Sequence, residues 1–282
     1  MLSITSKRLC FRANPEKPAA AKALENLRAF AATRCTVVDG VDVAGSRPDR
    51  VVVIGGDGTL IGVARSMGRD QVPLIGVNVG KLGFLTEFSV DEVRRNFDEA
   101  VGNDSLISKR MVLDVAVFRG GQSLRAFLAI NDCVIQAGPP FRIIHLGMSV
   151  DGEPLTDLDG DGVIVSTPIG STAHSLSAGG PIMQPGVEAI ILTPMNPHSL
   201  THKPLVIERD SVIEVEAMGV NAGTTLIIDG QVSCPLQKGD CVRIKRFDTE
   251  VLVVRNPVHS VWHKLVTKLH WGRRPESETA GM

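Results

Sequence analysis

Apolar positions in the first third of the chain gather in short runs with helical stretches between them. The runs cover residues 8–13, 35–40, 51–56 and 72–80. Between the first two runs, small and apolar residues recur at the spacing of one helix face: Ala20, Ala23, Leu24, Leu27 and Ala31. Near-continuous apolar runs are typical of parallel strands buried on both faces. This part therefore predicts an open, Rossmann-like α/β domain, with ligands beyond the carboxyl ends of its strands, where Asp57 and Asn78 lie.

From about residue 110 the apolar residues alternate with polar ones. The alternating segments are short and cover residues 113–118, 143–150, 212–217, 225–232, 241–247 and 250–255. Asp-Gly pairs at 151–152 and 229–230 predict hairpin turns. A series of short alternating strands predicts a β-sandwich-like second domain.

The last part of the chain returns to a helical pattern. Several apolar side chains of residues 259–272 fall on one helix face, namely Val261 or Trp262, Leu265, Val266 and Leu269. We expect this C-terminal helix to pack back on the first domain. The predicted division is an α/β domain over residues 1–108, joined by 255–282, and a β-rich domain over 109–254.

Composition excludes several classes of partner. The chain has 282 residues, and 30 Lys and Arg stand against 31 Asp and Glu, which argues against a nucleic-acid binder held by bulk charge. Five cysteines without a CxxC pair argue against a disulfide framework or a zinc site and fit a reducing cytoplasm. The start lacks the apolar core of a signal peptide, and no apolar run reaches membrane-spanning length. We therefore expect a cytoplasmic protein with neither a nucleic-acid nor a membrane partner.

A glycine-rich turn, GGDGT at residues 55–59, follows the third apolar run. We expect its glycines to adopt positive φ and to come close to a ligand. The turn matches neither GxxxxGK[ST] nor GxGxxG. A carboxylate beside phosphate either holds a bridging metal or accepts a proton from an attacking hydroxyl, and both indicate a kinase of a small alcohol. The alternative is a tight turn in which Asp57 is only a helix N-cap.

Two motifs of the second domain also suit ligand binding. Residues 129–138 contain Asn131-Asp132, and residues 159–182 are dense in Gly, Ser and Thr. The first could be a plain turn and the second a polar strand end. A stretch so rich in small hydroxyl residues is nonetheless better suited to cradling a ligand.

With these motifs in this order, the chain resembles the NAD kinase family. The resemblance rests on GGDGT, GKLGFLTE (80–87), the Asn-acid pair, DGxIVSTPxGSTAxSLSAGGPI (161–182), PHSLTHKPLVI (197–207), DGQ (229–231) and KLHWGR (268–273). It covers nearly the whole chain. It implies an α/β domain, an NAD-binding β domain and a C-terminal return to the first. It also implies transfer of the ATP γ-phosphoryl group to the adenosine ribose 2′-hydroxyl of NAD, with Mg²⁺ held mainly by ATP, and a homo-oligomer, dimer or tetramer.

The resemblance assigns roles to individual residues. It implies that Asp57 is the proton acceptor and that Gly58 brings its N–H to the ligand. Phe84 would line the adenine side, although it could equally be a core residue. Asn131 and Asp132 would hold the nicotinamide-side ribose.

Further contacts follow from the later motifs. Asp161 would read the nicotinamide carboxamide, with Asp159 as a weaker neighbour. Arg142 and Asn196 occupy positions that contact ligand in some members, but Arg142 could be a surface charge. The remaining implied contacts are Thr172, Ala173, His174, Ser175 and Ser177 in TAxSLS, and Asp229 and Gln231 in DGQ. A hairpin turn alone would explain Asp229-Gly230 but not Gln231.

The chain departs from the family pattern at three positions. Asp132 stands where Glu is usual, and Ile169 and His174 stand where Thr and Tyr are usual. His174 exchanges a stacking ring for a smaller, titratable one. Because the chain has no tyrosine at all, His174 reflects either tuning or a general avoidance of tyrosine.

Two other functions compete with this interpretation. A diacylglycerol- or sphingosine-type lipid kinase also uses GGDGT, but the polar block at 159–182 argues against an apolar acceptor. A non-catalytic pyridine-nucleotide sensor would explain the three departures, but the retained Asp57 argues against it.

Overall fold

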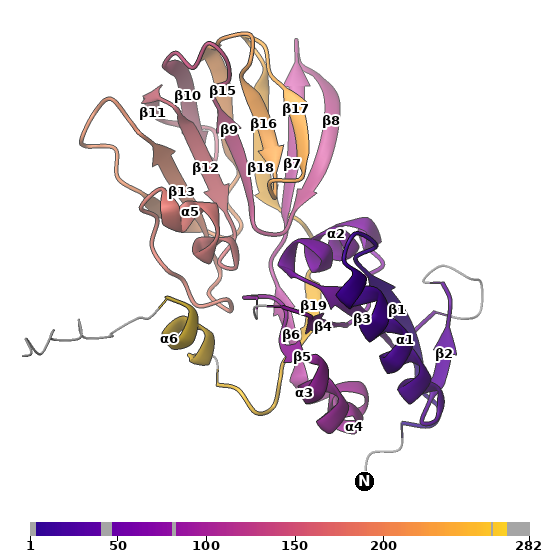
Figure 1. Cartoon of the computed structure of the whole chain (residues 1–282). Helices are drawn as coiled ribbons and strands as arrows, with labels where there is room; N and C mark the ends of the chain where they lie inside the picture. The colour runs from indigo at the N-terminus through magenta and orange to yellow at the C-terminus, as the bar shows by residue number, and fades with distance from the viewer. Residues whose placement is uncertain (1–3, 41–46, 81–82, 261, 270–282) are drawn as a thin grey trace, which may run out of the picture.

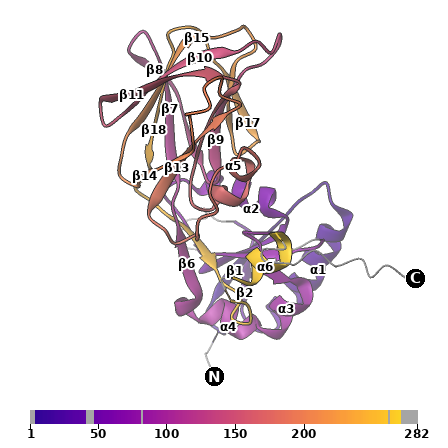
Figure 2. The same cartoon turned by 90° about the vertical axis from the view of Figure 1, so that its left-hand side faces the viewer.

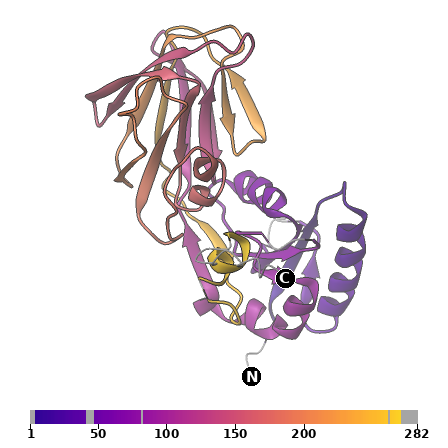
Figure 3. The same ribbon diagram turned by 60° about the vertical axis from the view of Figure 1, so that its left-hand side comes forward.

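The chain forms two domains, one built on a mostly parallel sheet and the other a sandwich of two antiparallel sheets (Figure 1). The structure is a computed structural model that describes residues 4–40, 47–80, 83–260 and 262–269. In Figures 1 and 3 the sandwich lies above the α/β domain, and helix α2 lies at their junction.

The first sheet has the order β2-β1-β3-β4-β19-β6, and β5 pairs with β4. Its strands are β1 (Arg8–Ala13), β2 (Thr36–Val38), β3 (Arg50–Gly55), β4 (Leu74–Asn78), β5 (Phe88–Ser89), β6 (Ile107–Arg110) and β19 (Val251–Val254). The helices are α1 (Pro18–Ala32), α2 (Asp57–Met67), α3 (Val90–Arg95), α4 (Phe97–Gly102) and the 3₁₀ helix η1 (Asp104–Leu106). Every residue of β3 and β4 is buried, as the apolar runs predicted.

Helices cover both faces of this sheet. Helices α1, α3 and α4 pack with alternate residues of β1, β3 and β4 in one cluster on one face. Helix α2 packs on the other face, in a cluster that also takes in Ile130 and Ile169 of the second domain. The helix that begins at Asp57 is therefore packed against both domains.

The second domain is a sandwich of two six-stranded sheets around one core, which confirms the predicted fold class. One sheet, in the order β11-β10-β15-β18-β7-β8, consists of β7 (Leu113–Arg119), β8 (Gln122–Ala129), β10 (Ile144–Val150), β11 (Glu153–Gly160), β15 (Ile213–Gly219) and β18 (Cys241–Arg246). The other, in the order β14-β13-β12-β9-β16-β17, consists of β9 (Asp132–Gln136), β12 (Gly162–Ser166), β13 (Ala189–Met195), β14 (Leu205–Glu208), β16 (Thr225–Ile228) and β17 (Val232–Pro235). Both predicted Asp-Gly turns join paired strands, and all four turn residues have positive φ.

One strand lies elsewhere than its pattern suggested. The segment 250–255, grouped with the second domain, forms β19, which joins the first sheet parallel to β4 and antiparallel to β6. Its alternation reads like a sandwich strand, but Val251 and Val253 are buried under the α2 face of the first sheet. The predicted boundary at 108/109 likewise falls inside β6.

Two short helices lie within the hydroxyl-rich block of residues 159–182, and a third lies near the end of the described residues. They are η2 (Gly170–Thr172), α5 (His174–Ser177) and α6 (His263–Leu269). Figure 2 shows α6 below α5 and beside the α/β domain. Lys264 of α6 contacts Phe84 and Glu87 of the first domain, so the described part of the tail packs as expected. Val261, residues 270–273 of KLHWGR and residues 81–82 of GKLGFLTE lie outside the described residues.

Candidate active site

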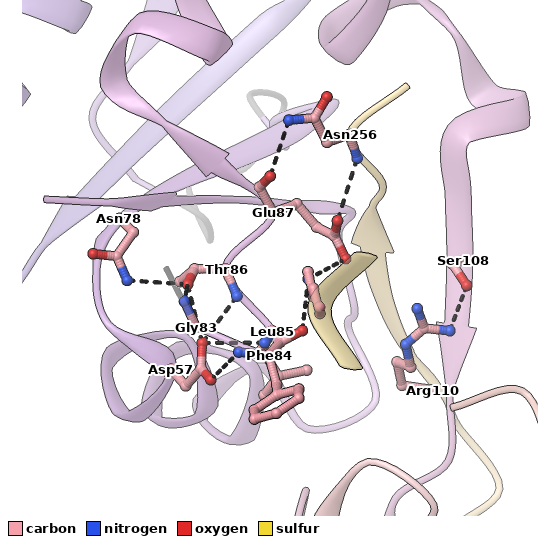
Figure 4. A network of polar contacts seen from close by, with 11 residues as sticks. Asp57, Asn78, Gly83, Phe84, Leu85, Thr86, Glu87, Ser108, Arg110 and Asn256 are labelled. Carbon is pink, nitrogen blue, oxygen red and sulfur yellow. Dashed lines mark hydrogen bonds and ion pairs between the residues drawn. The ribbon is translucent and has the colours of Figure 1, made fainter. Parts of the chain in front are cut away.

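Asp57 is the first residue of α2, and one residue, Gly56, separates it from the end of β3. The N-cap of α2 is Gly56 and not Asp57, and no side chain caps this helix. The Asp57 carboxylate therefore does not bind the N–H groups of its own helix. It turns instead to the loop before β5 (Figure 4). Its Oδ2 accepts the Phe84 N–H at 2.6 Å, and its Oδ1 accepts the N–H groups of Leu85 and Thr86 at 3.1 and 2.9 Å.

The Thr86 hydroxyl completes this cradle. It donates to Asp57 Oδ1 at 3.1 Å and accepts from the Gly83 N–H at 2.9 Å and from Asn78 Nδ2 at 3.2 Å. A Cβ at Gly83 would lie 1.8 Å from Asp57 Oδ1, so only glycine lets the loop close this tightly. Oδ1 takes three donors and Oδ2 only one, which leaves Oδ2 with a lone pair for a further donor.

Helix α6 supports the same loop from its other side. Lys264 Nζ donates to the Phe84 carbonyl and to Glu87 Oε1, both at 2.7 Å. Lys268 Nζ lies 4.5 Å from the centre of the Phe84 ring, a cation–π contact. Burial lowers the pKa of Lys268, and the Asp57 charge acts in the opposite direction.

A cavity of about 560 Å³ opens beside this loop. Phe84 and Leu85 line one side, Ile169 and Thr172 of the second domain another, and Leu265 of α6 a third. The walls are mostly apolar, and the cavity spans both domains. This suits a ligand with a flat apolar group.

Asn131 and Asp132 lie where β9 begins, at the end of the sandwich that faces α2. The Asn131 Oδ1 is buried and has no hydrogen-bond partner among the described residues. Asp132 is only 4% exposed. Burial first, and then the charge of Asp229, raise the pKa of Asp132 to about 7, while the His174 backbone N–H acts in the opposite direction.

Asp229 and Gln231 bind protein groups on both sides of the domain junction. The Asp229 carboxylate accepts the N–H groups of Ile130, Asn131 and Asp132, and its side chain is completely buried. It also forms an ion pair with Arg65 of α2 at 2.9 Å. The predicted ligand contact of Asp229 stays a prediction, and the observed contacts of its carboxylate are with the backbone of residues 130–132 and with Arg65.

The TAxSLS residues have different environments. Thr172 lines the cavity and Ala173 is half-buried, whereas the side chains of His174 and Ser177 are exposed. Ser175 is fully buried, and its hydroxyl lies 2.9 Å from that of Thr193. Ser175 therefore packs the turn that presents its neighbours.

The other predicted contacts gather at the opposite end of the sandwich. Asn196 Nδ2 donates to Asp161 Oδ2 at 2.8 Å, and Asp159 pairs with His145 Nδ1 at 2.8 Å. Arg142 is exposed on the loop after β9. Since Ser166 pairs with Asp132 and Gly162 with Gln136, four residue steps, or roughly 13 Å of strand, separate this group from Asn131-Asp132.

The glycines of GGDGT do not adopt the positive φ that we expected, since Gly55, Gly56 and Gly58 are not among the positive-φ residues. At two of these positions, the lack of room for a side chain explains the glycine instead. A Cβ at Gly55 would lie 2.5 Å from Thr59 Oγ1, and one at Gly58 would lie 3.2 Å from Gln231 Nε2. Gly56 has nothing within 4 Å of such a Cβ, so this side of the turn stays open to a close ligand.

The structure adds site residues that the sequence patterns did not single out: Arg65, Thr86 and Lys264. Thr86 lies in the recognised GFLT motif, so that motif was the available signal. Arg65 and Lys264 read as ordinary helix charges, and their partners lie 164 and 177 residues away in the chain. Across the described ranges, no group of three or more His, Cys, Asp or Glu side chains is placed to hold a metal ion. Nor is any described helix long and apolar enough to cross a membrane.

Comparisons with known proteins agree along the chain. A family model described as the ATP-NAD kinase N-terminal domain matches residues 9–104, and one described as the ATP-NAD kinase C-terminal domain matches residues 130–256. The NAD kinase of Geotalea daltonii is 42% identical over 240 residues, 85% of this chain and 84% of that protein. The NAD kinase of Trichlorobacter lovleyi is 44% identical over 229 residues, 81% of this chain and 80% of that protein.

Solved structures share the fold. Yeast NADH kinase complexed with NADH has a TM-score of 0.84 at 24% identity, covering 97% of this chain and 90% of that one. An NAD kinase from Archaeoglobus fulgidus in complex with ATP has a TM-score of 0.69 at 26% identity, covering 89% and 94%.

Proposed function

The chain belongs to the NAD kinase family, and on this premise we propose how its residues convert NAD to NADP. Asp57 is the proton acceptor for the adenosine ribose 2′-hydroxyl of NAD, and ATP supplies the γ-phosphoryl group. The observation that supports this most is the Asp57 carboxylate itself. Four donors hold it in place, yet Oδ2 keeps one lone pair for a substrate hydroxyl.

In the proposed step, the ribose 2′-oxygen attacks the γ-phosphorus of ATP. The new O–P bond forms while the bond to the β-phosphate oxygen breaks, and the hydroxyl proton passes to Asp57 Oδ2. A positioned base contributes about 10²–10⁴-fold in rate. Because phosphoryl transfer has a loose transition state, positioning and charge stabilisation supply much of the rest.

Mg²⁺ enters this proposal with ATP. The N-terminus of α2 is open at Gly56, where nothing lies within 4 Å of an added Cβ, and this opening fits phosphates that bring the ion with them. When bound, the ion neutralises phosphate charge. Gly58 is left to offer its backbone N–H to the ligand.

The remaining contacts hold NAD across the junction. Phe84 and Thr172 line the cavity, and the adenine side of NAD lies there, next to Ala173 and His174, which follow Thr172 in the chain. Asn131 meets a ribose hydroxyl with its unpartnered buried Oδ1, and Asp132 accepts from the same ribose.

The distant group at the other end of the sandwich, described above, supports the proposed homo-oligomer. Asp161 and Asn196 are hydrogen-bonded to each other at 2.8 Å but lie roughly 13 Å of strand from Asn131-Asp132. A second copy of the chain could bring these residues to a ligand that the first copy holds. Light scattering on the purified chain tests this, and a monomer at working concentration contradicts it.

An NADP-formation assay tests the proposed function directly. ATP and polyphosphate serve as donors, NAD and NADH as acceptors, and diacylglycerol as the lipid control, each with and without Mg²⁺. We expect NADP from ATP and NAD. Binding of NAD without NADP formation would instead favour the sensor, and lipid phosphorylation would favour the lipid kinase.

All five cysteines are free and four are buried, which fits the proposed cytoplasmic location.

A further inference from the structure

The carboxylate of Asp229 holds the segment that carries Asn131 and Asp132. Its Oδ1 accepts the N–H of Ile130 at 3.0 Å, of Asn131 at 2.7 Å and of Asp132 at 3.2 Å. In return, the Asp229 N–H donates to the Asp132 carbonyl at 2.9 Å. Three successive N–H groups on one oxygen fix the start of β9 in position. Asp229 reaches them because it occupies the positive-φ turn between β16 and β17.

The same turn grips α2 at two points. Arg65 Nη1 binds Asp229 Oδ2 at 2.9 Å, and Arg65 Nη2 binds Gln231 Oε1 at 2.6 Å. Gln231 Nε2 then donates to the Gly58 carbonyl, also at 2.9 Å. Gly58 follows Asp57 directly, and Arg65 lies two helical turns further along α2. In Figures 1 and 3 the lower ends of β16 and β17 lie next to α2.

We propose that Arg65 and Asp229 form a positioning pair, which sets the ribose-binding Asn131-Asp132 segment against the helix that begins at Asp57. Neither residue touches the reacting atoms. Arg65 acts through Asp229, and Asp229 acts through the backbone of residues 130–132. The inference rests on the proposed function, since the pair sets the position of the proton acceptor relative to the nicotinamide-side ribose that Asn131 and Asp132 hold.

Burial makes this pair different from an ordinary surface ion pair. The Asp229 side chain is fully buried and that of Arg65 is 20% exposed, so removing Arg65 strands a buried charge. A matched pair lies one turn further along the chain, where Arg69 binds Asp248 across the same junction. There the side chains are 67% and 58% exposed, so little is expected of that contact.

The pair also controls charge near Asp132. The groups that face Asp132 are the Asp229 carboxylate, the Cys133 thiol behind it and the His174 backbone N–H, with Arg65 beyond Asp229. Loss of a cation raises the pKa of neighbouring carboxyls. Without Arg65, the Asp132–Asp229 pair therefore releases its proton at a higher pH.

The test compares full-length Arg65→Met, Arg65→Lys and Arg69→Met with the wild type. For Arg65→Met we expect the KM for NAD to rise about tenfold and the midpoint of the pH profile of kcat/KM for NAD to move up by about half a unit or more. The KM for ATP should change by less than about twofold. Arg65→Lys restores the charge and should return the midpoint to that of the wild type, while Arg69→Met should match the wild type throughout.

Three outcomes would overturn the positioning pair. One is an Arg65→Met variant that only lowers the melting temperature and keeps the NAD KM and the midpoint. Another is an Arg69→Met variant that is impaired to the same degree. The third is an Arg65→Lys variant whose midpoint lies above that of the wild type. This comparison can still be made if Arg65→Met fails to fold. Failure of the proposed function is seen separately, as a wild type that makes no NADP.

Discussion

The two acidic regions of the site hold their carboxylates in different ways. Asp57 lies in the α/β domain and receives four hydrogen bonds from a single short loop. Asp132 and Asp229 lie in the β domain, and Arg65 forms an ion pair with Asp229. The donors there are shared unevenly, because Asp229 takes three backbone N–H groups and the ion pair. The difference teaches that buried Asp132 and Asp229 differ mainly in their supply of donors, because the backbone N–H groups and Arg65 favour the charged form of Asp229.

Asp132 is the member of the second region that titrates. Burial raises the pKa of both carboxyls, but the donors around Asp229 favour its charged form. Asp132 has the charge of Asp229 beside it and reaches a pKa of about 7. One region thus holds the proposed proton acceptor in a firm cradle, and the other offers a group whose charge depends on pH near neutrality.

The largest effect is expected from the first region. Asp57→Asn should lower kcat by about 10²–10⁴-fold, because the proton acceptor is lost. The KM for NAD should stay within a few-fold of the wild-type value. Steady-state kinetics with varied NAD and ATP measures both parameters, and turnover near that of the wild type would remove Asp57 from the base role.

The structure shows that Asn is not a silent replacement for Asp57. One of its two amide positions is an NH₂ donor, which would face the Phe84 N–H or the three donors at Oδ1. Thr86→Val is the matched control, since it disturbs the same cradle but leaves the carboxylate in place. If Thr86→Val loses as much turnover as Asp57→Asn, the loop rather than the proton acceptor carries the effect.

The second region should show itself in stability. Burial and the charge of Asp229 hold the folded-state pKa of Asp132 at about 7, above the ordinary value of an aspartate, so its stabilising contribution is complete below about pH 4 and is lost as the pH rises through about 7. Asp132→Asn cannot ionise. At pH 8 the variant should have the larger free energy of unfolding, by up to roughly 4 kcal/mol for a shift of about three units.

Chemical denaturation of both proteins from pH 4 to pH 8 measures this difference. The gap between the variant and the wild type should widen with pH and level off above the folded-state pKa. Asp114→Asn, which changes a half-buried surface carboxylate paired with Lys245, controls for a general effect of removing one acid. A gap that stays constant with pH would mean that Asp132 does not titrate in this range.

The fold was largely predictable because its signals are local. The runs of β3 and β4 are buried on both faces, and the Asp151-Gly152 and Asp229-Gly230 turns each join two strands. Strand β19 was misplaced because alternation shows which face of a strand is buried but not which sheet it joins.

The site was predictable in its residue types but not in its division of labour. The motifs identify Asp57, Asn131 and Asp132, yet they cannot show that Asp57 is held by a loop 27 to 29 residues away. Asp229 and Ser175 also belong to the recognised motifs, but their side chains are buried and contact other protein groups, Arg65 and Thr193 among them. Such roles depend on long-range contacts, which one sequence does not display.

A pH profile sharpens the comparison at the level of NAD binding. If the charged form of Asp132 accepts the ribose hydroxyls, kcat/KM for NAD should rise about tenfold between pH 6 and pH 8, as expected for a pKa near 7. Asp132→Asn should remove this rise. His174→Tyr is the control for the neighbouring imidazole. The rise should persist in that variant, because Asp132 is still present. A rise that disappears in His174→Tyr and persists in Asp132→Asn would assign the titration to the imidazole.

The smallest effect is expected at the C-terminal helix, which supports only the first region. Lys264 is 11% exposed and bridges the Phe84 carbonyl and Glu87, so it steadies the loop whose N–H groups hold Asp57. Lys264→Met keeps most of the side-chain volume but loses both contacts, and kcat should fall about two- to fivefold through a looser cradle. The midpoint of the NAD pH profile should not move, because Asp132 lies in the other region, where Asp229 and the His174 backbone set its pKa. A moved midpoint would show that the two acidic regions respond to the same support, and the distinction between a fixed acceptor and a titrating partner would then fail.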